Sequence, residues 1–180
     1  KLHISKSLKK LCRKKKFEFS INHNFLSTIS NCANREETWI NKSIKSTYNT
    51  LHDLGYAHSI EVWEDKKLKG GLYGVAIGKI FFAESMFSTS SNGSKLALIA
   101  LMGTLALNQF LLLDVQFMTN HLRTMGAKEI SRALFLNLIK KSTSEKVQFN
   151  KPRSIIIDEM LINKAEMKSL ISISKLKHQI

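Results

Sequence analysis

The chain has 180 residues, 43% of them hydrophobic, so it is long enough for one domain with a buried core. Its formal net charge of +14 indicates a polyanionic partner such as nucleic acid, the alternative being a basic surface that is only solvated. The two cysteines, Cys12 and Cys32, exclude a disulfide framework and favour a reducing, cytoplasmic environment.

The N-terminal third predicts a basic helical arm, a strand and two further helices. The arm is residues 1–16, in which every charged side chain is basic, and its helix has Leu8 and Leu11 on one side. The last of these helices carries apolar residues at three- and four-residue steps and ends at Gly55. Its periodic residues are Trp39, Ile40, Ile44, Tyr48 and Leu51. The expected elements are helix 4–14, strand 17–21, helix 24–30 and helix 37–54.

The middle of the chain predicts an antiparallel meander of three strands. A charged turn, EDKKLKGG, and Gly78 join the three strand-like runs, and connections this short link antiparallel neighbours. The runs are residues 59–63, 72–77 and 79–86.

A long apolar stretch, residues 96–113, is nearly long enough to cross a membrane. Thr104, Asn108 and Gln109 interrupt it, so we prefer a core helix, with Ser94 as its N-cap, followed by a buried strand. The remaining elements are expected as helix 95–108, strand 110–116, helices 118–125 and 128–139, and a helix from about Asp158.

These elements predict an α+β fold in which helices flank a mostly antiparallel central sheet. We expect one domain at 1–141, which includes the basic arm, and a divergent C-terminal tail at 142–180, where the pattern fades. No signal peptide is evident, and we expect a monomer that does not enter a membrane.

Polar residues interrupt the last strand of the meander in an unusual way. Glu84 and Ser85 lie between Phe82 and Met86, where a simple buried strand would carry no carboxylate. Glu84 is therefore either a structural ion-pair partner or a carboxylate that recognises a ligand.

Asp114 and Gln116 form a second polar pair, at the end of an otherwise buried strand. Strand alternation points both side chains to the same face. They either cap a neighbouring helix or turn, or act as a proton acceptor and an orienting hydrogen-bonding group. Trp39 likewise has two interpretations, as a core residue or as a ring that stacks on a nucleobase.

No cofactor or metal is predicted. The run from Gly74 to Lys79 is one residue too short for a P-loop, and Ile80 stands where a Ser or Thr would hold magnesium. The six histidines show no zinc-site spacing.

Seven motifs follow one another between about Leu2 and Ile139: TWI, YNTLHDLGYAHSIEVW, GGLYGV, FFAESMFS, NGSK, LDVQ and HLRTMGA. In order and nearly without gaps, they resemble those of leucyl/phenylalanyl-tRNA protein transferases. The resemblance implies a fold like that of the N-acetyltransferase (GNAT) superfamily. It also implies transfer of leucine or phenylalanine, with methionine as a third candidate, from aminoacyl-tRNA to the N-terminal Arg or Lys of a protein, which marks that protein for degradation.

The resemblance also assigns roles to residues. Asp114 would accept from or orient the attacking amine and Gln116 would position the ester carbonyl, since an α-amine with an ordinary pKa of about 7.7–8.0 must lose its proton to attack. Glu84 would serve the adenosine or the cationic acceptor residue. The terminal adenosine would meet Trp39, with Tyr48 nearby. The amino-acid pocket would consist of Leu72, Phe81, Leu101 and Leu113. The acceptor-stem phosphates would meet Lys6, Lys9, Lys10, Arg13 and Lys14.

The chain also departs from the family pattern. Ala83 and Val115 replace a usual Gly and Cys, and Leu101 stands where relatives often carry an aromatic residue. We find no counterpart of the family's N-terminal segment with GGDLSP-like and FPWF-like motifs. A noncatalytic tRNA-binding remnant is therefore the alternative function. A small-molecule acyltransferase of the same fold is disfavoured because no glycine-rich pyrophosphate loop precedes a helix.

Overall fold

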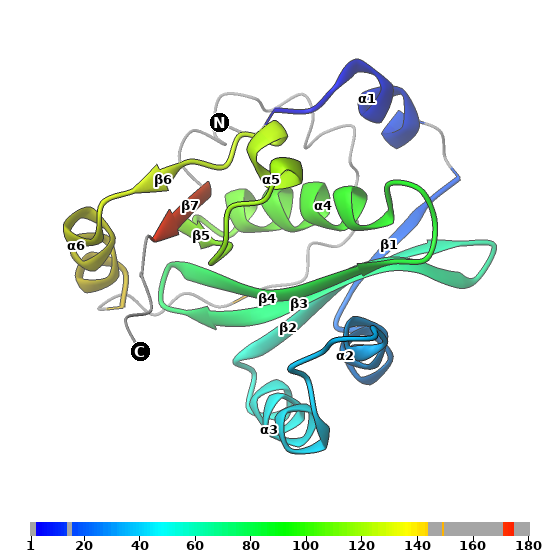
Figure 1. Cartoon of the computed structure of the whole chain (residues 1–180), viewed down its shortest axis with the longest axis horizontal. Coiled ribbons are helices and arrows are strands. Elements are labelled where there is room, and N and C mark those ends of the chain that lie inside the picture. The colour runs from blue at the N-terminus through cyan, green and yellow to red at the C-terminus, as the bar shows by residue number, and fades with distance from the viewer. Residues whose placement is uncertain (1–2, 14–15, 144–148, 150–170, 175–180) are drawn as a thin grey trace.

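The computed structural model of the protein describes residues 3–13, 16–143, 149 and 171–174 (Figure 1). The described strands form one sheet, and helices occur before, between and after them in the chain. The first part of the chain forms α1 (Lys6–Arg13), β1 (Glu18–Ile21), α2 (Phe25–Ala33), α3 (Lys42–Asp53), β2 (Ala57–Glu64), β3 (Lys67–Ile77) and β4 (Ile80–Ser88). The second part forms α4 (Gly93–Leu107), β5 (Leu112–Asp114), α5 (Asn120–Thr124), β6 (Glu129–Ile130), α6 (Arg132–Thr143) and β7 (Ile171–Ser174).

The strands of the described residues follow the order β1-β2-β3-β4-β5-β7-β6 across the sheet. β2, β3 and β4 pair antiparallel in chain order, as their short connections predict, and β1 pairs antiparallel with β2 although α2 and α3 lie between them in the chain. β5 runs parallel to β4, and β7 runs parallel to both β5 and β6. α4 makes the crossover that a parallel neighbour requires. The predicted mixed fold, with a mostly antiparallel central sheet and flanking helices, is confirmed.

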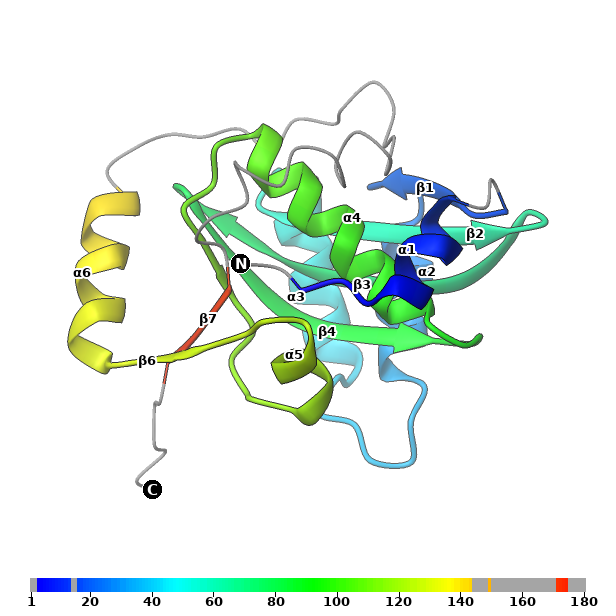
Figure 2. The same ribbon diagram turned by 90° about the horizontal axis from the view of Figure 1, so that it is seen from above.

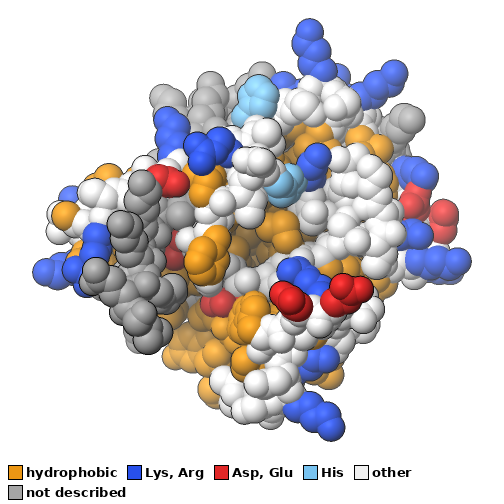
Figure 3. Space-filling view, viewed as in Figure 1, with side chains coloured by type: hydrophobic (Ala, Val, Ile, Leu, Met, Phe, Trp, Pro, Cys, Tyr) orange, Lys and Arg blue, Asp and Glu red, His pale blue; other side chains and the backbone are white. Residues whose placement is uncertain are grey.

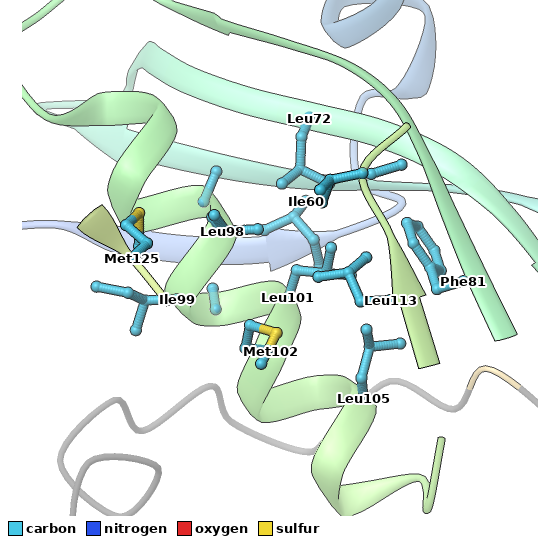
Figure 4. Close-up of a cluster of buried hydrophobic side chains, with 14 of the residues drawn as sticks. Ile60, Leu72, Phe81, Leu98, Ile99, Leu101, Met102, Leu105, Leu113 and Met125 are labelled. Carbon is cyan, nitrogen blue, oxygen red and sulfur yellow. The ribbon is translucent and has the colours of Figure 1, made fainter. Parts of the chain in front are cut away.

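Helices cover both faces of the sheet. Figures 1 and 2 show α4 along one face and α2 and α3 against the other. α4 is apolar on nearly all sides and most of its residues are buried, as expected for a helix enclosed by other elements. Its methionine and all its leucines except Leu107 pack in the main hydrophobic core (Figure 4), where Ile60, Leu98 and Leu105 are fully buried. No helix of the described residues is both long enough and apolar enough to cross a bilayer.

An asparagine determines the start of two helices whose predicted starts are wrong, α3 and α4. α3 begins at Lys42 because the Asn41 side chain accepts a hydrogen bond from the Ile44 N–H at 2.9 Å, so Trp39 and Ile40 precede the helix. The residue at the N-cap of α4 is Asn92, in the left-handed region with φ 70°, and Ser94 lies inside the first turn. In both cases an asparagine is the N-cap residue, and the sequence pattern had placed the helix start at a different residue.

The C-terminal part differs more from the prediction. α6 begins at Arg132, because residues 129–130 form the short strand β6, and it extends to Thr143. Residues 171–174 form a strand, not the helix expected from about Asp158. The rest of that predicted helix lies outside the described residues.

Candidate active site

A β-bulge directs Glu84 out of the regular alternation of β4. Tyr73 of β3 pairs with Ser85 and the next residue, Gly74, pairs with Ala83, so Glu84 is an extra residue without a partner in the ladder. Phe81 and Ala83 before the bulge pack on the α4 side of the sheet. Beyond it, Met86 packs on that side and Phe87 on the α2 side, opposite to what uninterrupted alternation would give. The polar interruption in the sequence therefore coincides with a break in the strand.

The end of β5 brings Asp114 and Gln116 together by a turn. The strand ends at Asp114, and Gln116 has φ 60° with a 2.6 Å hydrogen bond from the Phe117 N–H to the Val115 carbonyl around it. This is a γ-turn with a positive central φ, a rare and strained form that costs about 1–3 kcal/mol. The two side chains were expected to meet through strand alternation, and the turn achieves the same result.

These side chains form one hydrogen-bonded cluster, which we call the Asp114 cluster: Tyr48, Glu84, Asp114 and Gln116. Gln116 Nε2 donates to Glu84 Oε2 at 3.2 Å, and the Gln116 backbone N–H donates to Asp114 Oδ1 at 3.0 Å. The Tyr48 hydroxyl of α3 donates to the same Glu84 carboxylate. Glu84 has no ion-pair partner among the described residues, so the ion-pair interpretation gains no support there.

Burial raises the pKa values of both carboxyl groups in the Asp114 cluster. For Glu84 the raising effect of burial and of the nearby Asp114 charge outweighs the hydrogen bonds from Gln116 and Tyr48, which lower the pKa. For Asp114, burial raises the pKa more than the Gln116 N–H lowers it. Two carboxyl groups kept close together at a desolvated site are typical of functional sites.

The face of the cluster towards α2 contains residues that the sequence reasoning missed. The Tyr73 ring contacts the Tyr48 ring edge-on at 5.1 Å between centroids, and its buried hydroxyl has no hydrogen-bond partner among the described residues. Arg35 donates to Ser85 Oγ at 3.3 Å and to the Met86 carbonyl, which fastens the α2–α3 loop to β4 beside Glu84. For Tyr73 the only sequence signal was strand alternation in GGLYGV, which places its side chain on the opposite face of the sheet from that of Leu72.

Cys32 lies close by and has the properties of an inert thiol. Burial raises its pKa to about 12, although Ser85 and Arg35 act in the opposite direction. Cys32 therefore packs as a small apolar side chain.

Trp39 lies on the α2–α3 loop, four residues beyond Arg35, and 52% of its surface is exposed. A core tryptophan would be buried, so the core interpretation is wrong for this residue. Figure 3 shows a hollow between this loop and the segment after β5, with apolar side chains around it and an acidic side chain within it.

The four residues expected to form an amino-acid pocket lie on the opposite side of the sheet from Tyr73. Each is at most 1% exposed, and all four belong to the core between the sheet and α4 (Figure 4). A ligand side chain can reach them only if neighbouring side chains move apart, so this pocket stays a prediction. The four are Leu72, Phe81, Leu101 and Leu113.

The basic arm places its charges in solvent. Leu8 of α1 is buried in the main core, whereas Lys6, Lys10 and Arg13 are exposed and Lys9 is partly exposed. Lys14 lies outside the described residues. The helix is therefore held by its apolar side and offers its cationic side to a partner.

The Asp114 cluster presents mainly hydrogen-bond acceptors. Asp114 Oδ1 takes the Gln116 N–H, and no other donor among the described residues reaches this carboxylate. With the amide N–H of Gln116 bound to Glu84, its amide oxygen is left as a further acceptor. Such a site suits a ligand that brings donors, such as an amine, and the carboxylate can take a proton from it.

Comparison with known proteins gives a family match over most of the chain. The family described as "Leucyl/phenylalanyl-tRNA protein transferase" matches residues 1–140, which include every described member of the Asp114 cluster and α1.

Curated relatives agree with this match. Proteins named "Leucyl/phenylalanyl-tRNA--protein transferase" are 46% identical in Dinoroseobacter shibae, 47% in Syntrophus aciditrophicus and 48% in Zymomonas mobilis subsp. mobilis. The matches cover 81%, 77% and 79% of this chain. The chain spans 65%, 60% and 54% of the length of these relatives, respectively.

Proposed function

Because the chain belongs to the leucyl/phenylalanyl-tRNA protein transferase family, we propose that it transfers leucine or phenylalanine from aminoacyl-tRNA to the N-terminal Arg or Lys of acceptor proteins. Methionine is a third donor amino acid in this proposal. The reaction takes place in the cytoplasm and creates an N-terminal degradation signal. The mixed fold with a mostly antiparallel sheet supports a GNAT-like assignment for the domain at 1–141, with 142–180 as a tail.

The observation that carries this proposal is the Asp114 cluster. It joins a buried carboxylate, an amide and a second carboxylate at the end of β5 and the bulge of β4, through hydrogen bonds of 3.0 and 3.2 Å. An aminoacyl ester is already activated, so attack by an amine requires only correct placement and removal of a proton.

In the proposed reaction the neutral α-amine of the acceptor attacks the carbonyl carbon of the aminoacyl ester. A peptide C–N bond forms, the ester C–O bond to the terminal ribose breaks, and the ribose hydroxyl is the leaving group. Asp114 accepts the hydrogen bond of the amine and removes the proton that the ribose oxygen finally receives. The second amide N–H of Gln116 donates to the ester carbonyl, and the strained backbone conformation of this residue fixes where its amide lies.

The remaining residues in this proposal bind the two substrates. Glu84 receives the cationic acceptor residue or the adenosine, and Tyr48 keeps that carboxylate in place. Trp39, which is 52% exposed on its loop, stacks on the terminal adenine. The amino-acid side chain occupies the apolar region of Leu72, Phe81, Leu101 and Leu113 by shape and burial alone. The exposed cationic side chains of α1 bind the phosphates of the acceptor stem.

The test is transfer of labelled leucine from charged tRNA to a peptide that begins with Arg. A peptide of the same sequence that begins with Gly is the matched control. We expect label in the Arg peptide only, and more from leucyl- than from valyl-tRNA. Absence of label from both peptides, with tRNA still bound, would instead support the noncatalytic alternative.

A further inference from the structure

A continuous surface formed by α1, α5 and the start of α4 carries no acidic side chain. The three segments 3–13, 89–95 and 117–128 contain no Asp or Glu, although the whole chain has 14 of them. In Figure 3 basic and histidine side chains lie over α5 and α1 with no acidic side chain between them. The cationic and histidine members are His3, Lys6, Lys9, Lys10, Arg13, Lys95, His121, Arg123 and Lys128.

Specific contacts hold these segments together. The His3 N–H donates to the Met125 carbonyl at 2.9 Å, which ties the segment before α1 to the end of α5. Leu8 of α1 lies in the same buried cluster as Leu122 and Met125 of the α5 region. Figures 1 and 2 both show α5 beside the segment that leads into α1. The surface is therefore built by packing and is not a chance grouping of long side chains.

The start of α4 joins the same surface because Leu96, the residue after Lys95, lies in the same buried cluster as Leu8, Leu122 and Met125. Burial lowers the pKa of His121, and the charge of Lys95 acts in the same direction. His121 Nε2 is buried and has no hydrogen-bond partner among the described residues. A buried ring nitrogen without a partner is costly unless a ligand supplies one.

The position of α5 connects this surface to the Asp114 cluster. Thr119, the N-cap of α5, follows Gln116 by only three residues, while the other side of α5 lies against the segment before α1. An RNA whose terminal adenosine is at Trp39 and whose acceptor stem is on α1 must cross α5 between them. The nucleotides that cross it are single-stranded, and their phosphates are the groups that cations bind.

We propose that Lys95, His121 and Arg123 bind the phosphodiester groups of the single-stranded 3′ end of tRNA, between the terminal adenosine and the acceptor stem. This proposal rests on the proposed function, because it takes the RNA partner from it. The three residues position the nucleotide chain and take no part in the chemical step.

Two RNA probes distinguish the contribution of this surface to binding from that of α1. One is an acceptor-stem duplex with a 3′ CCA overhang, and the other is the same duplex with a blunt end. Their affinities are measured by fluorescence anisotropy over a range of salt concentrations. The double variant Lys95→Gln/Arg123→Gln should weaken binding of the overhang RNA by about tenfold and lower its salt slope by about 1.4, at about 0.7 per single-strand phosphate. Binding of the blunt RNA should change by less than about twofold.

A matched control removes two exposed positive charges elsewhere, in the variant Lys67→Gln/Lys140→Gln. The control should leave the salt slope of both RNAs unchanged. Arg123→Gln alone, at an exposed position, is a second variant with little risk to folding, and it should lower the overhang slope by about 0.7.

The proposal is overturned if the double variant behaves like the control, or if it weakens the overhang and blunt RNAs equally. Failure of the proposed function gives a different pattern. In that case the unmodified chain would bind the overhang RNA more tightly than the blunt RNA but would transfer no leucine. The proposed activity would then be wrong, while the proposed phosphate contacts would stand.

Discussion

At the scale of single residues, Gln116 and Glu84 occupy positions that ordinary strands do not offer. Gln116 lies in the left-handed region with φ 60°, and Glu84 is the extra residue of a bulge. Both irregularities cost free energy, and both bring polar atoms into the Asp114 cluster. Irregular backbone of this kind concentrates at functional sites because regular alternation would direct these side chains elsewhere.

We predict that Glu84→Gln stabilises the protein at neutral pH. The pKa of Glu84 is raised in the folded state, so between its ordinary and raised pKa values the folded state binds more protons than the unfolded state. The free energy of unfolding therefore falls as pH rises through this window, and the neutral amide avoids that loss. We expect the melting temperature of the variant to exceed that of the parent by a few degrees at pH 8 and the gap to close by about pH 4.

The matched control for this comparison is Glu37→Gln, on the exposed α2–α3 loop, where a solvated carboxyl pays no burial cost. If the melting temperatures of Glu84→Gln and the parent differ by the same amount at pH 4 and pH 8, packing and not ionisation explains the effect at Glu84.

Trp39→Ala tests the assignment of an exposed aromatic residue. Because half of the ring is already in solvent, the melting temperature should change by no more than about 2 °C. Binding of a leucyl-adenosine analogue should weaken by about 1–3 kcal/mol if the ring stacks on adenine. Calorimetric titration measures the second quantity, and unchanged affinity would remove Trp39 from the adenosine site.

At the scale of elements, the β3–β4 pair depends on a glycine where two backbones come close. A Cβ at Gly74 would meet the Phe82 carbonyl oxygen and lie 2.5 Å from Cε1 of the Phe81 ring. The close approach of β3 and β4 therefore explains why a glycine stands at this position.

We predict that Gly74→Ala destabilises the protein by about 1–3 kcal/mol, the usual cost of overpacking. Urea unfolding measures this as a lower midpoint with an unchanged slope. An unchanged midpoint would mean that β3 and β4 separate more easily here than their hydrogen-bonded register indicates.

The basic face of α1 gives a prediction about salt. Replacement of Lys6, Lys9 and Lys10 by Gln should flatten the salt dependence of tRNA binding by about two to three units, at about 0.9 per duplex phosphate. The variant Lys42→Gln/Lys67→Gln/Lys140→Gln removes the same charge at other exposed positions and is the control. If both variants have equal slopes, net charge alone attracts the RNA and α1 has no special role.

The sequence predicted elements well where the signal was local. The meander of β2 to β4 followed from short turns, and the covered helix α4 followed from apolar residues on all sides. The start of α3 was missed because the apolar period continued through Trp39 and Ile40, while the Asn41 cap decided the boundary. β7 was missed because its pairing with β5 depends on residues far away in the chain.

At the scale of the whole molecule, the site is assembled from three separate parts of the chain. Tyr48 comes from α3, Glu84 from β4, and Asp114 and Gln116 from the end of β5. Sequence could nominate Glu84, Asp114 and Gln116 by their unexpected polarity, whereas the family resemblance nominated Tyr48 and supplied the roles of all four. It could not show that they meet, because the bulge in β4 and the parallel pairing of β4 with β5 are set by contacts between strands.

The distribution of charge belongs to the same scale. The acid-free segments on α1, α4 and α5 contain seven of the 28 Lys and Arg residues, and their buried side chains pack in one cluster. Composition alone predicted a polyanionic partner, and packing determines where that partner can lie.

The most direct test of the catalytic role of the Asp114 cluster is the single-turnover rate of leucine transfer from charged tRNA to an Arg peptide, measured with Asp114→Asn beside the parent chain. Asparagine keeps the shape of the side chain and removes the proton acceptor. We predict a rate about 10²- to 10⁴-fold lower, with tRNA affinity changed by less than about twofold. An unchanged rate in a variant that is fully folded would contradict the assignment of Asp114 as the residue that takes the proton.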